Sequence, residues 1–402
     1  MKKTIAALAV LGAFAGSAAA ADVTVYGVVD TGLLYKWQDT EGFYNGVGVD
    51  SESAFTMESG LNSASRFGLK GSEDLGNGMK VSFKLENGFD ADDGELGQSG
   101  RLFGRESSVS LTGNFGTVSF GRMGGVASSA GTYDIVYATA DAFDGGDNDV
   151  LGLAISSRYD NMVTYQTPVF GAFQATAQYS FKNDSKAGGD EGKSSADRYG
   201  SFAVTGSFGA LNLVGAWEMQ NRASGSAITE DGNTFYVGGN YDCGFAKTFF
   251  MAQYFMNGSA VGAFNYDDIG YGKITSEGFD GFGLHLGTQF PALAGNVTIG
   301  LYYVDATAKG TNGSDANTSE GWSYSADFDD VDTTYYGIAG RYEYSLSKRT
   351  LVYAGAGYYQ LKADAFTGTE TNLVNPSTKP ADAHRDYKDQ VAQAYIGLKH
   401  TF

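Results

Sequence analysis

The sequence predicts an all-β protein: a 16-stranded antiparallel transmembrane β-barrel with short turns at one end, long loops at the other and an inward-folded third loop. Three observations lead to this fold class. Hydrophobicity alternates with a period of two along the whole chain, the connections alternate between short and long, and the 402 residues include 26 Tyr, 27 Phe, 58 Gly and only 4 Pro. Few prolines suit long paired strands, and abundant aromatic residues suit the interfacial girdles of a membrane barrel.

The first twenty residues have the features of a cleaved secretory signal peptide. Lys2 and Lys3 form a charged region, residues 5–15 are apolar, and residues 17–20 are small. We expect the mature protein to span residues 21–402 as one barrel domain. Loss of Lys2 and Lys3 changes the formal charge from -19 to -21, and this acidity argues against nucleic-acid binding. No later stretch has the roughly 18 apolar residues of a transmembrane helix.

The period of two is clearest at residues 173–182, where Phe173, Ala175 and Ala177 alternate with Gln174 and Thr176. Such alternation predicts a strand with one apolar and one polar face. In a membrane barrel the apolar face contacts lipid and the polar face lines the lumen. The same pattern recurs at residues 79–86, 336–344 and 392–402.

The connections predict the number of strands. Seven are short and eight are long, which makes fifteen connections and therefore sixteen strands. The strands of a soluble β-sandwich also alternate, but a sandwich would not need sixteen consecutive strands joined by hairpins. Nor would it need short turns at one end and long loops at the other, which outer-membrane barrels have. The short connections lie at residues 74–78, 114–116, 170–171, 209–210, 243–244, 293–295 and 346–349, and the long ones near 37–55, 90–100, 124–157, 183–197, 221–232, 258–279, 308–331 and 364–389.

Several short motifs resemble the general porins of Gram-negative bacteria, in particular the trimeric outer-membrane porins of β-proteobacteria. Each is modest alone, but they occur in the family's order and cover essentially the whole mature chain. The motifs are SRFGLKGSEDLGNG at 65–78, FGR at 103–105, FGTVSFGR at 115–122, YSLSKRT at 344–350 and GLKHTF at 397–402.

The resemblance implies an outer-membrane homotrimer through which ions and small hydrophilic solutes diffuse passively. It implies that the third long connection, residues 124–157, forms a constriction, with arginines of the barrel wall facing acidic residues of this loop. It also implies that Phe402 is read as a signal by the outer-membrane assembly machinery. The acidic external loops could further bind divalent cations that bridge lipopolysaccharide.

Four arginines flank the third loop in the sequence. Arg66 shares a strand face with Lys70, and Arg158 shares one with Asp160. These faces must point to the lumen, because Arg or Lys against lipid at mid-bilayer costs about 2–4 kcal/mol. Simple alternation puts Arg105 on the apolar face of its strand, and a bulge near Ser107, or burial of this strand at a trimer contact, would reconcile it with a role in the lumen. Arg122 lies at a strand end, where alternation no longer constrains its direction.

The expected pore-lining set also contains Lys70, Lys80 and Lys84, and the acidic candidates Asp134, Asp141 and Asp144 of the third loop. Opposed charges at a constriction create a field that sorts ions. The lysines favour anions, whereas the loop acids and the net charge favour cations, although much of that charge is screened beyond about 8–10 Å. We expect a weak preference for cations, while the resemblance implies that anions are often preferred.

No cofactor or metal site is expected. His285, His384 and His400 lack metal-ligand spacing, residues 145–151 match only part of one calcium-binding turn, and Cys243 is a lone cysteine in a short connection. The alternative function is a substrate-specific channel for a small sugar or organic acid. An outer-membrane enzyme is disfavoured because no nucleophile–base pair is recognisable, and an adhesive role of the loops is compatible with a pore. A trimer would form through residues 23–35 and 391–402.

Overall fold

The computed structural model describes residues 22–41, 51–224, 226, 228, 230–262, 277–309, 330–369 and 382–402, with short segments at 43–44, 47–48, 264–265, 312–317 and 322–327. The expected signal peptide at residues 1–20 and the side chain of His384 lie outside the described residues.

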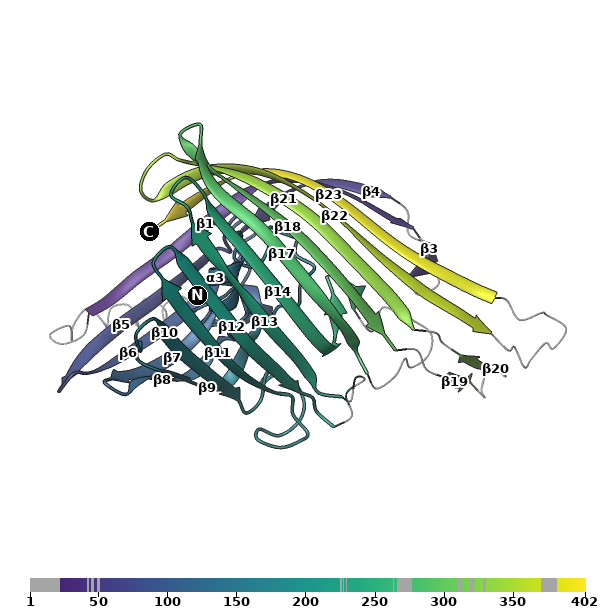
Figure 1. Ribbon diagram of the computed structural model, residues 1–402, viewed down its shortest axis with the longest axis horizontal. Helices are drawn as coiled ribbons and strands as arrows, with labels where there is room; N and C mark the ends of the chain where they lie inside the picture. Colours follow the sequence, from purple (N-terminus) through teal and green to yellow (C-terminus); the bar gives the residue numbers. More distant parts are fainter. Residues whose placement is uncertain are drawn as a thin grey trace, which may run out of the picture.

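The described residues form one antiparallel sheet that closes on itself as sixteen barrel positions, which confirms the predicted fold class (Figure 1). Each strand pairs with its neighbour in the sequence, and the first pairs with the last. The strands are β1 (Asp22–Glu41), β5 (Arg66–Gly76), β6 (Met79–Gly88), β7 (Glu106–Gly113), β8 (Gly116–Gly124), β9 (Arg158–Gln166), β10 (Phe173–Ser180), β11 (Arg198–Phe208), β12 (Leu211–Asn221), β13 (Gly232–Asp242), β14 (Lys247–Gly258), β17 (Phe279–Ala292), β18 (Gly295–Ala308), β21 (Val331–Ser345), β22 (Thr350–Thr369) and β23 (Asp382–Thr401).

Closure of the ring joins the two ends of the chain. The backbones of Gly27 and Phe402 exchange two hydrogen bonds, each 3.0 Å long. The register then continues from Val28 opposite Thr401 to Glu41 opposite Lys388. The Phe402 ring lies so close over Gly27 that a Cβ at that position would be 2.3 Å from it. Glycine is therefore required where the ring crosses the backbone of β1.

The second barrel position is interrupted once. β4 (Glu52–Ser59) and β5 both pair with β1 and are separated by residues 60–65. Asp30 of β1 fills this break, because its carbonyl oxygen accepts from the amide of Gly60 and its carboxylate accepts from the amide of Ser63. A buried backbone donor needs such a partner, so the interruption is stabilised rather than frayed.

The connections alternate in length as the sequence predicts. The short ones, such as residues 77–78 and 114–115, gather at one end, whereas β8 and β9 are separated by the long segment 125–157. Beyond the predicted limits, β1 continues to Glu41, β22 continues to Thr369 and β23 begins at Asp382. Smaller elements lie in the long connections: β2 (Phe43–Tyr44), β3 (Val47–Gly48), α2 (Gly97–Gly100), α3 (Val136–Ala140), β15 (Ala260–Val261), β16 (Phe264–Asn265), β19 (Asn312–Asn317) and β20 (Trp322–Asp327).

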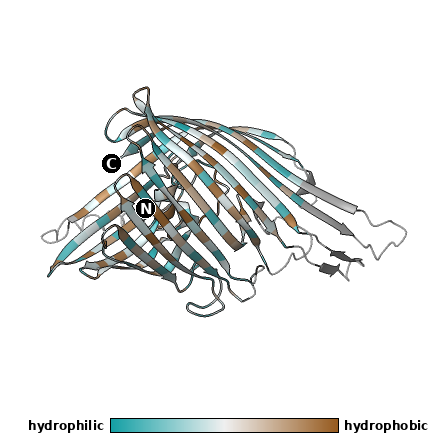
Figure 2. Cartoon of the chain, in the orientation of Figure 1, coloured by the Kyte–Doolittle hydropathy of each residue, from teal (hydrophilic) through white to brown (hydrophobic). Residues whose placement is uncertain are grey.

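Side chains alternate between the two faces of the wall. Figure 2 shows hydrophobic and hydrophilic bands following each other along the strands. Phe235, Val237 and Tyr254 are exposed on the outside, whereas Tyr236 and Gln253 are buried on the inside. Among the described residues no helix is long and apolar enough to cross a membrane.

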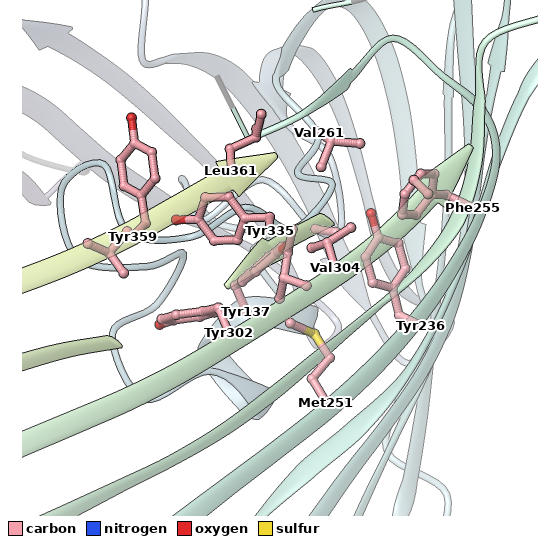
Figure 3. Packing of buried hydrophobic residues seen from close by; sticks show 14 of the residues in the cluster. Tyr137, Tyr236, Met251, Phe255, Val261, Tyr302, Val304, Tyr335, Tyr359 and Leu361 are labelled. Atoms are coloured by element: carbon pink, nitrogen blue, oxygen red, sulfur yellow. The ribbon is translucent and has the colours of Figure 1, made fainter. Parts of the chain in front are cut away.

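The main hydrophobic core lies inside the ring, between the wall and segment 125–157. Tyr137 of α3 packs there with Tyr236, Met251 and Tyr302 of three different strands (Figure 3). These inward positions are occupied by large side chains because they cover an internal segment rather than line water. The core therefore shows which part of the wall the segment occupies.

Candidate functional site

We call residues 125–157 the third loop. Its helix α3 packs against β12, β13 and β14 and is seen inside the ring of strands in Figure 1. Tyr137 and Ala140 are fully buried. The close fit needs a glycine in the wall, because a Cβ at Gly238 would be 2.7 Å from the Ala140 side chain. The sequence folds this segment inward because its apolar side chains find partners only on the inner wall.

The first anchor of the third loop is the carboxylate of Glu218 on β12. It accepts hydrogen bonds from the Ala127 amide at 3.2 Å, from Tyr236 at 3.0 Å and from Tyr199. Glu218 is only 5% exposed. A buried carboxylate is tolerated when several donors satisfy it, so this group joins the start of the loop to two strands at once.

The second anchor is Asp141, directly after α3. Its carboxylate accepts from the Phe143 amide at 2.8 Å and from the Tyr302 hydroxyl at 3.0 Å. Nε2 of His285 accepts from the Ala142 amide at 3.2 Å and lies 3.6 Å from the Asp141 carboxylate. Burial raises the pKa of Asp141, and the neighbouring His285 opposes this rise. Asp141 is thus enclosed by the wall and does not face open water.

The third anchor lies on β21 and β23. Asp147 pairs with Arg341 at 3.0 Å and accepts from the Tyr395 hydroxyl. Burial raises the pKa of Asp147, and Arg341 opposes this rise. The Arg341 guanidinium lies 5.0 Å from the centre of the Phe143 ring. A neighbouring ion pair joins Asp149 to Lys36 of β1 at 2.7 Å, so the tip of the loop is fixed at several points.

The structure brings the four arginines together on the opposite part of the wall. We call Arg66, Arg105, Arg122 and Arg158 the arginine cluster; they belong to β5, to the residue before β7, to β8 and to β9. Arg158 interacts electrostatically with the other three. Four like charges close together require counter-charges or water, because desolvated guanidinium groups repel one another.

Two members of the cluster have carboxylate partners. Nε of Arg105 donates to Glu86 at 2.8 Å, and Nη1 of Arg122 donates to Asp160 at 2.6 Å. Asp160 also pairs with Arg101 at 3.0 Å. Arg101 and Glu86 are not among the residues predicted from the sequence, although Glu86 shares a strand face with Lys84 and this shared face could have indicated it.

Arg66 and Arg158 lack such partners within the part of the chain that the structure describes. Arg66 donates to the carbonyl oxygen of Ala64 at 3.1 Å, and Nε of Arg158 is buried without a hydrogen-bond partner. Both are partly exposed. Within the described residues, these two guanidinium groups therefore form no ion pair.

The predicted lysines lie on the same wall. Lys84 pairs with Glu106 at 2.8 Å and lies 3.6 Å from Glu86. Lys70 is exposed, with its ammonium 5.1 Å from the centre of the Tyr26 ring. Lys80 is exposed near the turn between β5 and β6. Basic side chains thus continue from the arginine cluster toward the end of the barrel with short turns.

Asp134 and Asp144 form a carboxyl pair on the third loop. Burial and the neighbouring Asp144 raise the pKa of Asp134 to about 9, so at neutral pH the pair holds one proton. Asp144 is exposed and interacts electrostatically with Arg66. Of the three acidic candidates, Asp144 is therefore the one that is exposed and interacts electrostatically with Arg66, whereas Asp141 is buried against β17 and β18.

Two arginines depart from simple alternation for local reasons. Arg105 is buried beside Glu86 rather than on the apolar face, because β7 begins only at Glu106 and the preceding residue does not follow its pleat. Arg122 follows Gly121, which has a φ of 129°, and the register between β8 and β9 shifts there. A Cβ at Gly121 would lie 2.1 Å from the Ser107 carbonyl oxygen, so this irregularity requires glycine.

The histidines and the cysteine noted in the sequence do not form part of a metal site among the described residues. Among the described residues no three His, Cys, Asp or Glu side chains are arranged to hold a metal ion. Cys243 is exposed, and its Sγ lies 2.9 Å from the Ala246 carbonyl oxygen. Nδ1 of His400 lies 2.9 Å from the Thr350 hydroxyl at the seam between β22 and β23.

The comparisons with known proteins agree with this architecture. The model of the Gram-negative porin family matches residues 7–364. An outer membrane porin protein of Bordetella pertussis is 35% identical over 263 residues, which are 60% of this chain and 66% of the relative. Outer membrane porin protein 32 of Delftia acidovorans is 35% identical over 252 residues, 61% of this chain and 68% of the relative.

Among solved structures, the anion-selective porin from Comamonas acidovorans is 25% identical, with a TM-score of 0.62 over 95% of this chain and all of the other. The curated relatives match this chain over about two thirds of their own length, whereas the Comamonas porin structure matches it over nearly the whole barrel. Since the family model spans most of the sequence, this chain belongs to the Gram-negative porin family and is an outer-membrane protein.

Proposed function

We propose that the chain forms a water-filled channel for passive diffusion of ions and small hydrophilic solutes, with the third loop as its constriction and a weak preference for anions. This preference replaces the weak cation preference expected from net charge. The observation that carries the proposal is the pair Arg66 and Arg158, two guanidinium groups of the arginine cluster that form no ion pair with a carboxylate of the described residues.

The state of the acidic residues of the third loop also favours a preference for anions. Asp141 and Asp147 are buried and fully engaged, Asp149 is paired with Lys36, and Asp134 holds a proton. Only Asp144 remains as a charge facing the arginines. The charge that permeating ions meet at the constriction is then positive, whatever the sign of the whole chain, because exposed external charges are screened within about 8–10 Å.

We further propose a homotrimer, assembled through the outer faces of β1 and β23. Val25, Leu33 and Ile396 are exposed there and apolar. Contacts with lipopolysaccharide through the external loops, and recognition of Phe402 by the assembly machinery, belong to the same proposal. Phe402 has the position that such a signal needs, at the seam between the first and last strands.

A channel for a small organic acid is the second candidate. Lys70 and Lys80 are exposed on the inner face beyond the arginine cluster, so an anion leaving Arg66 would meet further cations. Such a channel would show a saturable block of chloride current by malonate at millimolar concentration. A general channel would show only the small reduction expected from added ionic strength.

The test of the proposal is the zero-current potential of the refolded protein in a planar bilayer under a KCl gradient. We expect the sign that corresponds to chloride preference, and we expect it to disappear in the double variant Arg66→Gln/Arg158→Gln. Arg349→Gln is the matched control, because Arg349 is exposed in the short turn between β21 and β22. A potassium-selective wild type would overturn the proposed preference, and absence of any conductance would overturn the channel itself.

A further inference from the structure

Tyr26 of β1 reaches across a neighbouring strand into the arginine cluster. In the register of the sheet Tyr26 lies opposite Gly68 of β5, and Gly68 lies opposite Glu86 of β6. The hydroxyl of Tyr26 donates to Oε2 of Glu86 at 2.8 Å. The side chain can span this distance because Gly68 has no side chain between them.

The contact between Tyr26 and Gly68 is tight. A Cβ at Gly68 would lie 2.6 Å from both Cζ and the hydroxyl oxygen of Tyr26. Real Cβ atoms do not approach other atoms so closely, so even alanine at this position would displace the ring. The Tyr26 ring therefore packs directly on the backbone of Gly68, with its hydroxyl bonded to Glu86.

Both oxygens of Glu86 are consequently engaged. Oε1 accepts from Nε of Arg105 at 2.8 Å and Oε2 accepts from Tyr26, with Lys84 further away at 3.6 Å. Glu86 is 4% exposed. A buried carboxylate that lost one donor would seek another, since an unsatisfied charged group is costly.

Arg66 is a donor without a carboxylate ion pair among the described residues, and it lies diagonal to Glu86. It lies two residues before Gly68 on the same face of β5, and it interacts electrostatically with both Glu86 and Tyr26. Diagonal neighbours in a sheet have Cα atoms about 7–8 Å apart, within reach of long side chains. An ion pair between Glu86 and Arg66 would neutralise one of the two free guanidinium groups.

We propose that Tyr26 is a specificity-determining positioning residue: by holding Glu86 toward Arg105 it keeps Arg66 unpaired and available to anions in the lumen. Tyr26 acts through Glu86 and need not contact the permeating ion. The inference rests on the proposed channel function and its anion preference, and it assigns part of that preference to a tyrosine hydroxyl that carries no charge.

The test is a double-mutant cycle in the reconstituted full-length protein, read out as the chloride-to-potassium permeability ratio from zero-current potentials. We expect Tyr26→Phe to lower this ratio by at least about twofold, because a hydrogen bond to a charged group is lost. On the background of Glu86→Gln, whose neutral amide cannot pair with Arg66, the same change should have no effect. An effect of one substitution that depends on the presence of the other residue is the coupling that a double-mutant cycle measures.

Tyr303→Phe is the matched control. Its hydroxyl also donates to a carboxylate, Asp305, at 3.2 Å, but Tyr303 is exposed among the outward-facing side chains of β18. We expect its permeability ratio to equal that of the wild type. Gly68→Ala provides an independent route, because it displaces the Tyr26 ring without removing the hydroxyl, and it should lower the ratio as Tyr26→Phe does.

The outcomes are distinguishable. A wild type without anion preference defeats the proposed function. An anion-selective wild type with an unchanged ratio in Tyr26→Phe overturns the inference, as does an equal drop on both backgrounds of Glu86. If Tyr26→Phe yields no channels, Gly68→Ala decides, and an unchanged ratio there overturns the inference as well.

Discussion

Two parts of the inner wall differ in the charged side chains that they carry and in how those side chains are paired. The half formed by β5 to β9 carries the arginine cluster and leaves Arg66 and Arg158 without carboxylate partners among the described residues. The half formed by β12 to β18 presents neutral and tyrosine side chains and is covered by the third loop. Its one buried carboxylate, Glu218, is enclosed by hydroxyl and amide donors. One half carries two guanidinium groups without ion pairs among the described residues, and the other half is covered by the third loop.

Under the proposed function, this difference is what gives a strongly acidic chain a basic lumen. The acids that could cancel the arginines serve instead as anchors, and tyrosine hydroxyls satisfy many of them: Tyr236 with Glu218, Tyr302 with Asp141, and Tyr395 with Asp147. The total charge of the chain is therefore a poor guide to ion preference, because charges buried in anchors and charges on distant loops do not act on the lumen equally.

The largest effect should come from breaking the covered half. Glu218→Ala leaves the Ala127 amide and two tyrosine hydroxyls without their acceptor. Each buried donor left unsatisfied costs about 1–3 kcal/mol, so the free energy of unfolding should fall by on the order of 3 kcal/mol. The measurement is the temperature at which the folded barrel converts to the unfolded band in gel electrophoresis, together with current noise in single channels.

Glu73→Ala is the control for this variant. Glu73 is exposed on β5, so its removal should leave both the unfolding temperature and the noise unchanged. If Glu218→Ala behaved like Glu73→Ala, the carboxylate of Glu218 would not hold the third loop to the wall.

An effect of intermediate size on the zero-current potential should distinguish Asp134 from Asp144. Because Asp134 holds a proton at neutral pH, Asp134→Asn should leave the zero-current potential at pH 7 unchanged. Asp144→Asn should shift it further toward anions, since it removes the charge that faces Arg66. Equal shifts in the two variants would mean that both carboxyls are ionised.

The same pair predicts a pH dependence of stability. The pKa of Asp134 is raised in the folded state from its ordinary value of 3.8 to about 9. Between these values the folded protein binds more protons than the unfolded chain, so the contribution of Asp134 to stability decreases as pH rises from about 4 to about 9. Asp134→Asn should remove this dependence, which thermal unfolding at pH 5, 7 and 9 would reveal.

The smallest effect on the free energy of unfolding is expected for an ion pair outside the β5–β9 and β12–β18 parts of the wall. Lys193 and Asp190 form an exposed ion pair at 3.2 Å in the connection between β10 and β11. Exposed pairs contribute little, so Lys193→Gln should change the free energy of unfolding by at most about 0.5 kcal/mol. A larger loss in thermal unfolding would show that this connection takes part in the stability of the barrel.

The barrel itself was predictable because alternation is a local property of the chain. The alternation of Phe173, Ala175 and Ala177 with polar residues shows within a few positions which side of the strand is apolar. The alternation of short and long connections gives the number of strands. The predicted limits of the long connections were wrong where strands continue beyond the alternating pattern. Residues up to Glu41, up to Thr369 and from Asp382 onward belong to strands, although their composition resembles that of loops. There, pairing with a neighbouring strand overrides local preference.

The site was predictable only in part. Alternation indicates inward directions for Arg66 and Arg158, but it puts Arg105 on the wrong face, because β7 begins only after this residue, and it gives no direction for Arg122. The partners of the loop acids could not be predicted, because the chain separates them widely: Asp147 and Tyr395 are 248 residues apart. His285 shows the same limit, since no local pattern relates it to Ala142. Roles that depend on such long-range pairs need a structure.

The seam between β1 and β23 has a consequence for how the protein is made. Gln38 and Asp389, which are hydrogen-bonded across it, are separated by 351 residues, so the first strand must wait for almost all of the chain before it finds its partner. Contacts between such distant residues form slowly, and an unpaired strand edge invites pairing with other chains. The time during which β1 lacks β23 is thus the period of greatest risk of aggregation, and the bonds between Gly27 and Phe402 end it.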